Sequence, residues 1–182
     1  MRAWRRALVR KHLLSGGLIA YPTEGVFGLG CDPFNPRAVQ RILELKGRAR
    51  RKGFILIAAS RGQLDRLVPP LPPPLEEQLQ RAQPITWLVP ASPAVPRWLR
   101  GRRRTLAVRI TAHPLAAELC QIFGGPLIST SANRSGRPPA RRLFEVYRSF
   151  GRTRDLLVVP GKVGGLSGPT PIVDLLSGER LR

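Results

Sequence analysis

The chain has 182 residues, 42% hydrophobic and 23% charged, and its 31 Lys and Arg against 11 Asp and Glu give a formal net charge of +20. This composition excludes a disordered chain, and the length predicts one globular domain over residues 1–182 with its own buried core. No apolar stretch reaches the length of a signal-peptide core or a membrane span, so we expect a cytoplasmic protein with no membrane partner.

The first half of the chain alternates helices and strands. An amphipathic first helix is predicted by residues that recur at helical spacing, which are Trp4, Ala7, Leu8, Lys11 and Leu14. The elements expected after it are a strand over Leu18–Tyr21, a helix over Pro36–Lys46 capped by Asn35, a strand over Phe54–Ala59, and a short helix from Ser60 to Leu67.

The second half begins with five prolines in Pro69–Pro74, which predict a stiff, extended surface segment. The elements expected after it are strands over Ile85–Val89 and Thr105–Ile110, a helix over Pro114–Phe123, a strand over Leu127–Ser129, a helix over Leu143–Phe150, and strands over Leu156–Val159 and Ile172–Leu175. The alternation places the chain in the α/β class, but strand order and direction do not follow from this pattern.

A glycine-rich segment follows the first strand. It reads YPTEGVFGLGCD, with Thr23 and Glu24 at the strand end, where α/β proteins bind ligands, and three glycines within the next six residues. Glycine lets the backbone approach a ligand closely, although a tight turn explains the same residues.

Two basic features have both a structural and a functional interpretation. The run KGRARRK, from Lys46 to Lys52, is either a solvated cap of the preceding helix or a clamp for phosphate groups. Arg109 interrupts an apolar strand, and a charge in such a place is either in a buried ion pair or bound to an anionic ligand.

A loop rich in hydroxyl and amide side chains follows the strand at Leu127. It carries Ser129, Ser131 and Asn133, which suit a polar ligand or a serine-rich turn. No Asp or His lies nearby in sequence to complete a serine triad, and two cysteines and two histidines are too few for a transition-metal site. Together the segments favour an anionic, phosphate-bearing small ligand.

Four segments resemble the YrdC/TsaC family, in the family's order: YPTEGVFGLGCD, the K-x-R of Lys46 and Arg48, LAVRITAHP, and STSANRSG. The resemblance runs from about Ala7 through nearly the whole chain. It implies a twisted sheet of mixed parallel and antiparallel strands, with flanking helices and a basic concave cleft. The chain resembles the short, single-domain members of the family.

The resemblance implies an enzyme that joins L-threonine, bicarbonate and ATP into L-threonylcarbamoyladenylate and pyrophosphate. Mg²⁺ would accompany ATP, bound by phosphates and water with no tight protein metal site. By position, the implied catalytic residues are Lys46, Arg48, Ser131 and Asn133. The implied threonine contacts are Thr23, Lys52, Arg109 and Thr170. The implied ATP contacts are Lys46, Arg48, Thr86, Ser129, Ser131 and Asn133.

The chain departs from the family pattern in two places. The family's P-G-P-x-T segment reads AQPIT here, so only its Pro84 and Thr86 remain, and the segment resembling P-S-T reads Pro169-Thr170-Pro171.

The resemblance further implies that separate proteins transfer the threonylcarbamoyl group to adenosine 37 of tRNAs that read ANN codons. The net charge of +20 indicates either tRNA binding or an arginine-rich composition. The alternative function is a non-catalytic RNA-binding module of the same fold. The related hydrogenase maturation proteins carry additional cysteine-rich modules, which this chain lacks.

Overall fold

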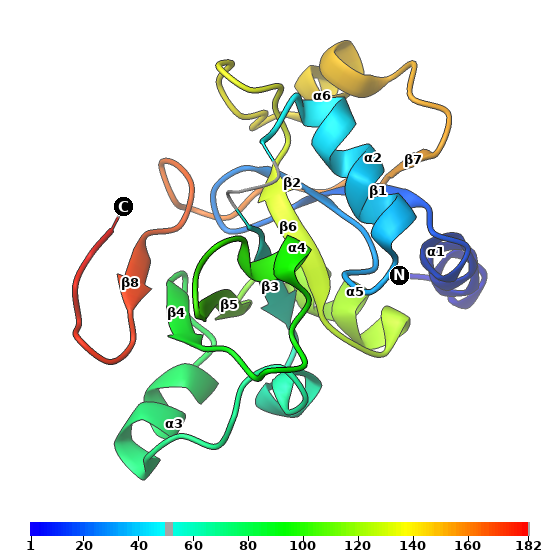
Figure 1. Cartoon of the computed structure of the whole chain (residues 1–182). Helices are drawn as coiled ribbons and strands as arrows, with labels where there is room; N and C mark the ends of the chain where they lie inside the picture. The colour runs from blue at the N-terminus through cyan, green and yellow to red at the C-terminus, as the bar shows by residue number, and fades with distance from the viewer. Residues whose placement is uncertain (50–52, 182) are drawn as a thin grey trace.

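A computed structural model describes residues 1–49 and 53–181 of the chain. Its centre is one mixed sheet with the strand order β7-β1-β2-β6-β3-β5-β4-β8, and Figure 1 shows β8 at one side and α1 at the other. The strands are β1 (Leu18–Pro22), β2 (Phe27–Gly30), β3 (Ile55–Ala58), β4 (Thr86–Pro90), β5 (Thr105–Ile110), β6 (Leu127–Ser131), β7 (Leu156–Val158) and β8 (Ile172–Asp174).

The helices surround this sheet. They are α1 (Ala3–Leu14), α2 (Pro36–Lys46), the 3₁₀ helix η2 (Arg61–Leu64), α3 (Pro73–Gln80), α4 (Arg97–Arg100), α5 (Pro114–Phe123) and α6 (Leu143–Phe150). The predicted helices over 36–46, 114–123 and 143–150 are confirmed to the residue. Asn35 caps α2 as predicted, because its Oδ1 accepts hydrogen bonds from the backbone N–H groups of Arg37 and Ala38, each at 3.1 Å.

The sheet contains both parallel and antiparallel strand pairs, so the alternation of helices and strands along the sequence did not predict strand direction. Strand β1 pairs antiparallel with β2 and parallel with β7, while β3 pairs parallel with β5 and antiparallel with β6. Strand β4 is antiparallel to β5 and parallel to β8. This confirms the α/β class and the mixed sheet.

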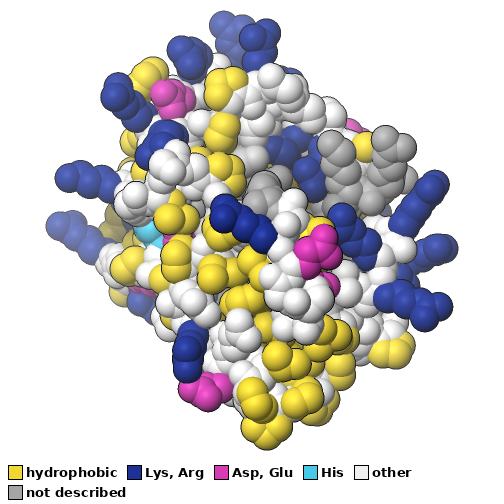
Figure 2. Space-filling view, turned by 90° about the vertical axis from the view of Figure 1, so that its left-hand side faces the viewer, with side chains coloured by type: hydrophobic (Ala, Val, Ile, Leu, Met, Phe, Trp, Pro, Cys, Tyr) yellow, Lys and Arg dark blue, Asp and Glu magenta, His cyan; other side chains and the backbone are white. Residues whose placement is uncertain are grey.

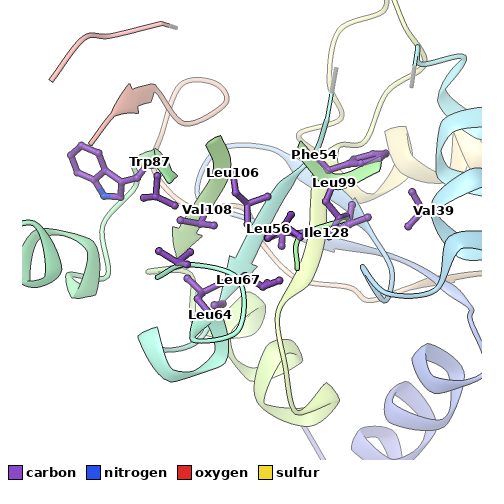
Figure 3. Close-up of a cluster of buried hydrophobic side chains, with 14 of the residues drawn as sticks. Val39, Phe54, Leu56, Leu64, Leu67, Trp87, Leu99, Leu106, Val108 and Ile128 are labelled. Atoms are coloured by element: carbon purple, nitrogen blue, oxygen red, sulfur yellow. The ribbon is translucent and has the colours of Figure 1, made fainter. Parts of the chain in front are cut away.

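One face of the sheet is covered over most of its width by α2, η2, α3 and α4. Side chains alternate along a strand, so Leu56, Val108 and Ile128, aligned by the register, all point to this face. Figure 3 shows these three packed with Val39 of α2 and Leu99 of α4, and all five are buried. Helix α6 covers the β1–β2 end of the same face.

The opposite face is only half covered. Helices α1 and α5 pack over Ile19, Ile57 and Leu127 there, through apolar side chains that include Val9 and Leu119. The remaining part of this face, at the first residues of β3 and β5 and the last residues of β6, is left open. A cleft lies in this opening.

The first helix is placed as predicted, but its predicted apolar stripe does not face the core. Trp4, Leu8 and Leu14 are exposed, whereas Val9 and Leu13 are fully buried. The reason is that the helix is apolar on two sides, and packing against α5 and β1 selects the side that carries Val9 and Leu13.

Three elements were not predicted. Strand β2 lies inside the glycine-rich segment, where it pairs with β1 as a hairpin. Helix α3 begins within the proline segment, because Pro73 and Pro74 occupy the first helical turn, where a missing N–H is harmless. Helix α4 has only four residues. Within residues 1–49 and 53–181, no helix combines the length and apolarity needed to cross a bilayer.

Candidate active site

A cleft of about 560 Å³ occupies the open part of the sheet. Small side chains make its floor: the register aligns Ser129 of β6 with Ile55 of β3 and with Ala107 of β5, and Gly28 of β2 pairs with Ser131. Because these positions lie on one face and most of them carry small side chains, they leave a hollow instead of filling it. A volume of this size is typical of sites for small-molecule ligands.

The walls of the cleft are cationic. Arg48, Arg100, Arg103 and Arg109 line it, and none of its lining residues in the described part of the chain is Asp or Glu. Arg48 donates from Nη2 to the carbonyl oxygen of Gly53 at 2.9 Å, and its guanidinium lies 5.5 Å from the ring centroid of Phe54. These guanidinium groups suit phosphate or carboxylate oxygens.

Lys46, in the last turn of α2, holds the Ser131–Asn133 loop. Its buried Nζ donates to the carbonyl oxygen of Ser131, to that of Asn133 at 2.7 Å, and to Asn133 Oδ1 at 3.3 Å. Burial, with the nearby Arg48 guanidinium, lowers the pKa of Lys46 to about 8. An ammonium is therefore fixed directly behind the hydroxyl-rich edge of the cleft.

The loop after β6 is ordered by its own side chains. Ser131 Oγ donates to Asn133 Oδ1 at 2.6 Å, and Asn133 Nδ2 donates to the carbonyl oxygen of Arg137 at 2.6 Å. The same loop is tied to the end of α2, because Ser135 donates from its N–H to the carbonyl oxygen of Lys46 and from Oγ to that of Gly47. Two motifs that lie 85 residues apart are thus joined by hydrogen bonds into one unit.

A buried ion pair lies beneath the cleft. Arg109 Nη2 is 3.0 Å from Glu24 Oε2, and both side chains are only 5% exposed. Arg109 Nη1 donates to Thr170 Oγ1 at 2.8 Å and to Thr86 Oγ1 at 3.2 Å, while Thr111 donates to Glu24 Oε1 at 2.6 Å. This network joins the β1–β2 turn, two strands and the segment before β8.

The segment before β8 forms one wall of the cleft through Pro169 and Thr170. It is held by the β1–β2 turn: the N–H of Gly164 donates to the carbonyl oxygen of Thr23, and the N–H of Leu166 to that of Glu24. Gly25 is required at this contact, since an added Cβ would lie 1.9 Å from the carbonyl oxygen of Gly168.

The structure brings nearly all the residues suggested by the resemblance to this cleft. Thr23, Arg48, Arg109, Ser129, Ser131 and Thr170 line it. Lys46, Asn133 and Thr86 lie directly behind it, in hydrogen-bond contact with lining residues. Lys52 lies outside the described residues.

These contacts bear on two of the alternatives left open by the sequence. Lys46 is buried and bonded to the loop after β6, so this first residue of the basic run is not a solvated helix cap, while residues 50–52 of the run lie outside the described residues. Arg109 forms the buried ion pair with Glu24, which is the structural interpretation of its position.

Sequence reasoning missed two lining arginines, Arg100 and Arg103, and the partner role of Glu24. The run RWLRGRRR around the two arginines was a signal, but in a chain with 31 basic residues it does not stand out. Figure 2 shows how widely Lys and Arg side chains are spread on one face of the molecule. The partner of a buried charge, 85 residues away, has no signature in sequence.

The donor groups around the cleft suit an anionic organic ligand. In the described part of the chain, no three Asp, Glu, His or Cys side chains gather as a metal site would require. Both free cysteines are buried, and burial raises the pKa of the Cys120 thiol to about 12.

Known proteins resemble this chain over nearly its whole length. A model of the Sua5/YciO/YrdC family, with the description Telomere recombination, matches residues 11–182. The chain is 55% identical to the threonylcarbamoyl-AMP synthase of Halorhodospira halophila, over 100% of this chain and 95% of that protein. It is 54% identical to the threonylcarbamoyl-AMP synthase of Nitrosococcus oceani, over 98% of this chain and 97% of that one.

A solved structure with the same fold is that of P. abyssi Sua5 complexed with L-threonine. It superposes with a TM-score of 0.88 at 31% sequence identity, over 99% of this chain and 53% of that chain, so this chain spans about half the length of that Sua5. With the family model matching from residue 11 onward and about half of all positions identical in two relatives, this chain belongs to the Sua5/YciO/YrdC family.

Proposed function

We propose that this chain is a threonylcarbamoyl-AMP synthase, which condenses L-threonine, bicarbonate and ATP to L-threonylcarbamoyladenylate, pyrophosphate and water. The observation that supports this most is the 55% identity, over the whole chain, with a relative of that name. The threonine complex of P. abyssi Sua5, a protein with the same fold, supports threonine as the amino acid. Residues 1–182 act as one domain in this proposal.

The cleft suits the charges of these substrates. Arg48, Arg100 and Arg103 are placed to neutralise the triphosphate of ATP. The hydroxyls of Ser129 and Ser131 are placed to bind its nucleotide portion. Thr23 and Thr170 offer hydroxyls for threonine, with Lys52 as a further candidate. Because Glu24 already neutralises Arg109, we assign Arg109 the task of orienting Thr170 and Thr86, in place of a direct carboxylate contact.

The reaction then needs positioning and charge neutralisation and no covalent protein intermediate. The threonine amine attacks bicarbonate or CO₂ to form an N-carboxylate, and this carboxylate attacks the α-phosphate in line as pyrophosphate leaves. Guanidinium groups and the Lys46 ammonium stabilise the charge that develops on pyrophosphate. Mg²⁺ enters with ATP as part of the substrate, bound by its phosphates and water.

The test is pyrophosphate release by the purified chain with Mg·ATP, bicarbonate and each amino acid in turn. We expect release only with threonine, and only when bicarbonate is present. A folded protein that releases no pyrophosphate with threonine, yet binds RNA with a steep salt dependence, would favour the alternative of a non-catalytic RNA-binding module, which the net charge of +20 supports.

The affinity for Mg·ATP is expected to fall as pH rises through about 8. Lys46 is charged below its pKa of about 8 and loses its positive charge above it, and an anionic ligand binds more weakly to a less positive site. Titration calorimetry with a non-hydrolysable ATP analogue from pH 6.5 to 9.5 should show a loss of about tenfold. In Lys46→Met the affinity should be lower and independent of pH. If the affinity of the wild-type protein does not change over this pH range, the role given to Lys46 is contradicted.

We propose further that the product serves N6-threonylcarbamoyladenosine formation at position 37 of tRNAs that read ANN codons, through separate transfer proteins. This use places the enzyme in the cytoplasm. The names of the relatives support the product. The tRNA step is tested by adding the transfer proteins and an ANN-reading tRNA to the reaction and measuring N6-threonylcarbamoyladenosine in the tRNA.

A further inference from the structure

A second basic region lies on α6 and the segment before it, outside the cleft. We define the α6 surface by the exposed side chains of Arg134, Arg137, Phe144, Tyr147, Arg148 and Arg152. Two hollows meet on it: one of about 880 Å³, lined by five of these six residues, and one of about 530 Å³. Both hollows are lined by Arg148, so they adjoin.

The arginines of the α6 surface outnumber the carboxylates near them. Within the described residues, none of the four forms a salt bridge with a carboxylate. The one acidic side chain in this region, Glu145, accepts hydrogen bonds from the backbone N–H groups of Arg141 and Arg142 at the start of α6. The charge of Glu145 also interacts with that of Arg148, so four arginines and one carboxylate leave this described surface with an excess of positive charge.

Two aromatic rings stand among these charges. Phe144 is 54% exposed and Tyr147 52% exposed, although Val146 and Phe150 of the same helix are buried. Phe144, Tyr147 and Arg148 are three and four residues apart, so they share one side of α6, and the Arg148 guanidinium lies 5.8 Å from the Phe144 ring centroid. Large exposed rings beside unpaired arginines are typical of sites for single-stranded nucleic acid.

The α6 surface adjoins the active site through one residue. Asn133 lines the larger hollow with its neighbour Arg134, while its side chain accepts from Ser131 Oγ and Lys46 Nζ and donates to the carbonyl oxygen of Arg137. A chain bound on α6 thus lies against the loop that forms the edge of the cleft.

We propose that the α6 surface binds a single-stranded segment of RNA, with phosphates on its arginines and bases stacked on Tyr147 and Phe144. RNA is favoured over an acidic polypeptide because it supplies both components at regular spacing, a negative charge and a flat aromatic face in each nucleotide. This surface is separate from the cleft, so the proposal goes beyond the synthase activity and does not depend on it.

The experiment measures binding of a fluorescently labelled 12-nucleotide single-stranded RNA by anisotropy, over a range of salt concentrations. The double variant Arg148→Ala/Arg152→Ala should bind at least about tenfold more weakly, and its salt dependence should be shallower by about 1.4 in log K against log salt, as for two lost phosphate contacts. Tyr147→Ala should weaken binding about tenfold with the slope unchanged, because stacking is not electrostatic.

The matched control is Arg10→Ala/Arg66→Ala, which removes two exposed arginines from α1 and from the turn after η2. Equal weakening by both double variants would overturn the proposal, since only overall charge would then matter. It would also fall if polyglutamate of the same charge bound as tightly as the RNA and responded to the same variants. The readout needs no turnover, so a chain inactive in pyrophosphate release would still give a valid result. Thermal unfolding confirms that each variant is folded.

Discussion

Replacement of Lys46 by alanine is expected to lower pyrophosphate release by about 10²–10³-fold. The ammonium holds two backbone carbonyls and the Asn133 side chain, so its removal frees the loop that carries Ser131 and leaves those oxygens without their charged donor. It also removes a positive charge directly behind the cleft. Both effects act on groups that must be held in place before the reaction, which is why the expected loss is large.

The control for this variant is Lys11→Ala. Lys11 also lies in the last turn of a helix, α1, but its side chain is exposed and far from the cleft in sequence and in the fold. We expect Lys11→Ala to keep wild-type turnover. Lys46→Met, which retains most of the apolar stem, separates lost charge from lost packing. Near-normal turnover in folded Lys46→Met would refute the role given to the ammonium.

Glu24→Ala is expected to lower the free energy of unfolding by about 3–5 kcal/mol, because it leaves the buried Arg109 guanidinium without its counter-charge. A loss of this size is a large fraction of the stability of an ordinary domain. The β1–β2 turn and the segment before β8 meet at this network, so the wall of the cleft should loosen as well. Urea denaturation followed by circular dichroism measures the change.

The chain contains a matched exposed pair for comparison. Arg81 and Glu77 form an i,i+4 ion pair on α3 with side chains 65% and 70% exposed, and Glu77→Ala should change stability by about 0.5 kcal/mol or less. The double variant Glu24→Ala/Arg109→Ala should lose less than the sum of its single variants, since no charge is left buried alone. If Glu24→Ala and Glu77→Ala changed the free energy of unfolding equally, the buried pair would contribute no more to stability than the exposed pair.

Local patterns were sufficient for most of the secondary structure. Helices α2, α5 and α6 and strand β5 have the predicted bounds, because capping residues, prolines and apolar spacing act over a few residues and leave their mark in sequence. Strand β2 was missed for the opposite reason: FGLG has two glycines in four residues and is held as a strand by pairing with β1 and β6.

The sequence by itself determined the α/β class and, through the family resemblance, the family and most of the side chains that the structure places in or behind the cleft. It did not determine which side of α1 is buried, that Lys46 bonds to Asn133, or that Arg109 pairs with Glu24. These facts depend on contacts between residues tens of positions apart, and only the strand order and the packing of helices on each face of the sheet bring such residues together. The cleft has the same origin, since it is the part of one sheet face that no helix covers.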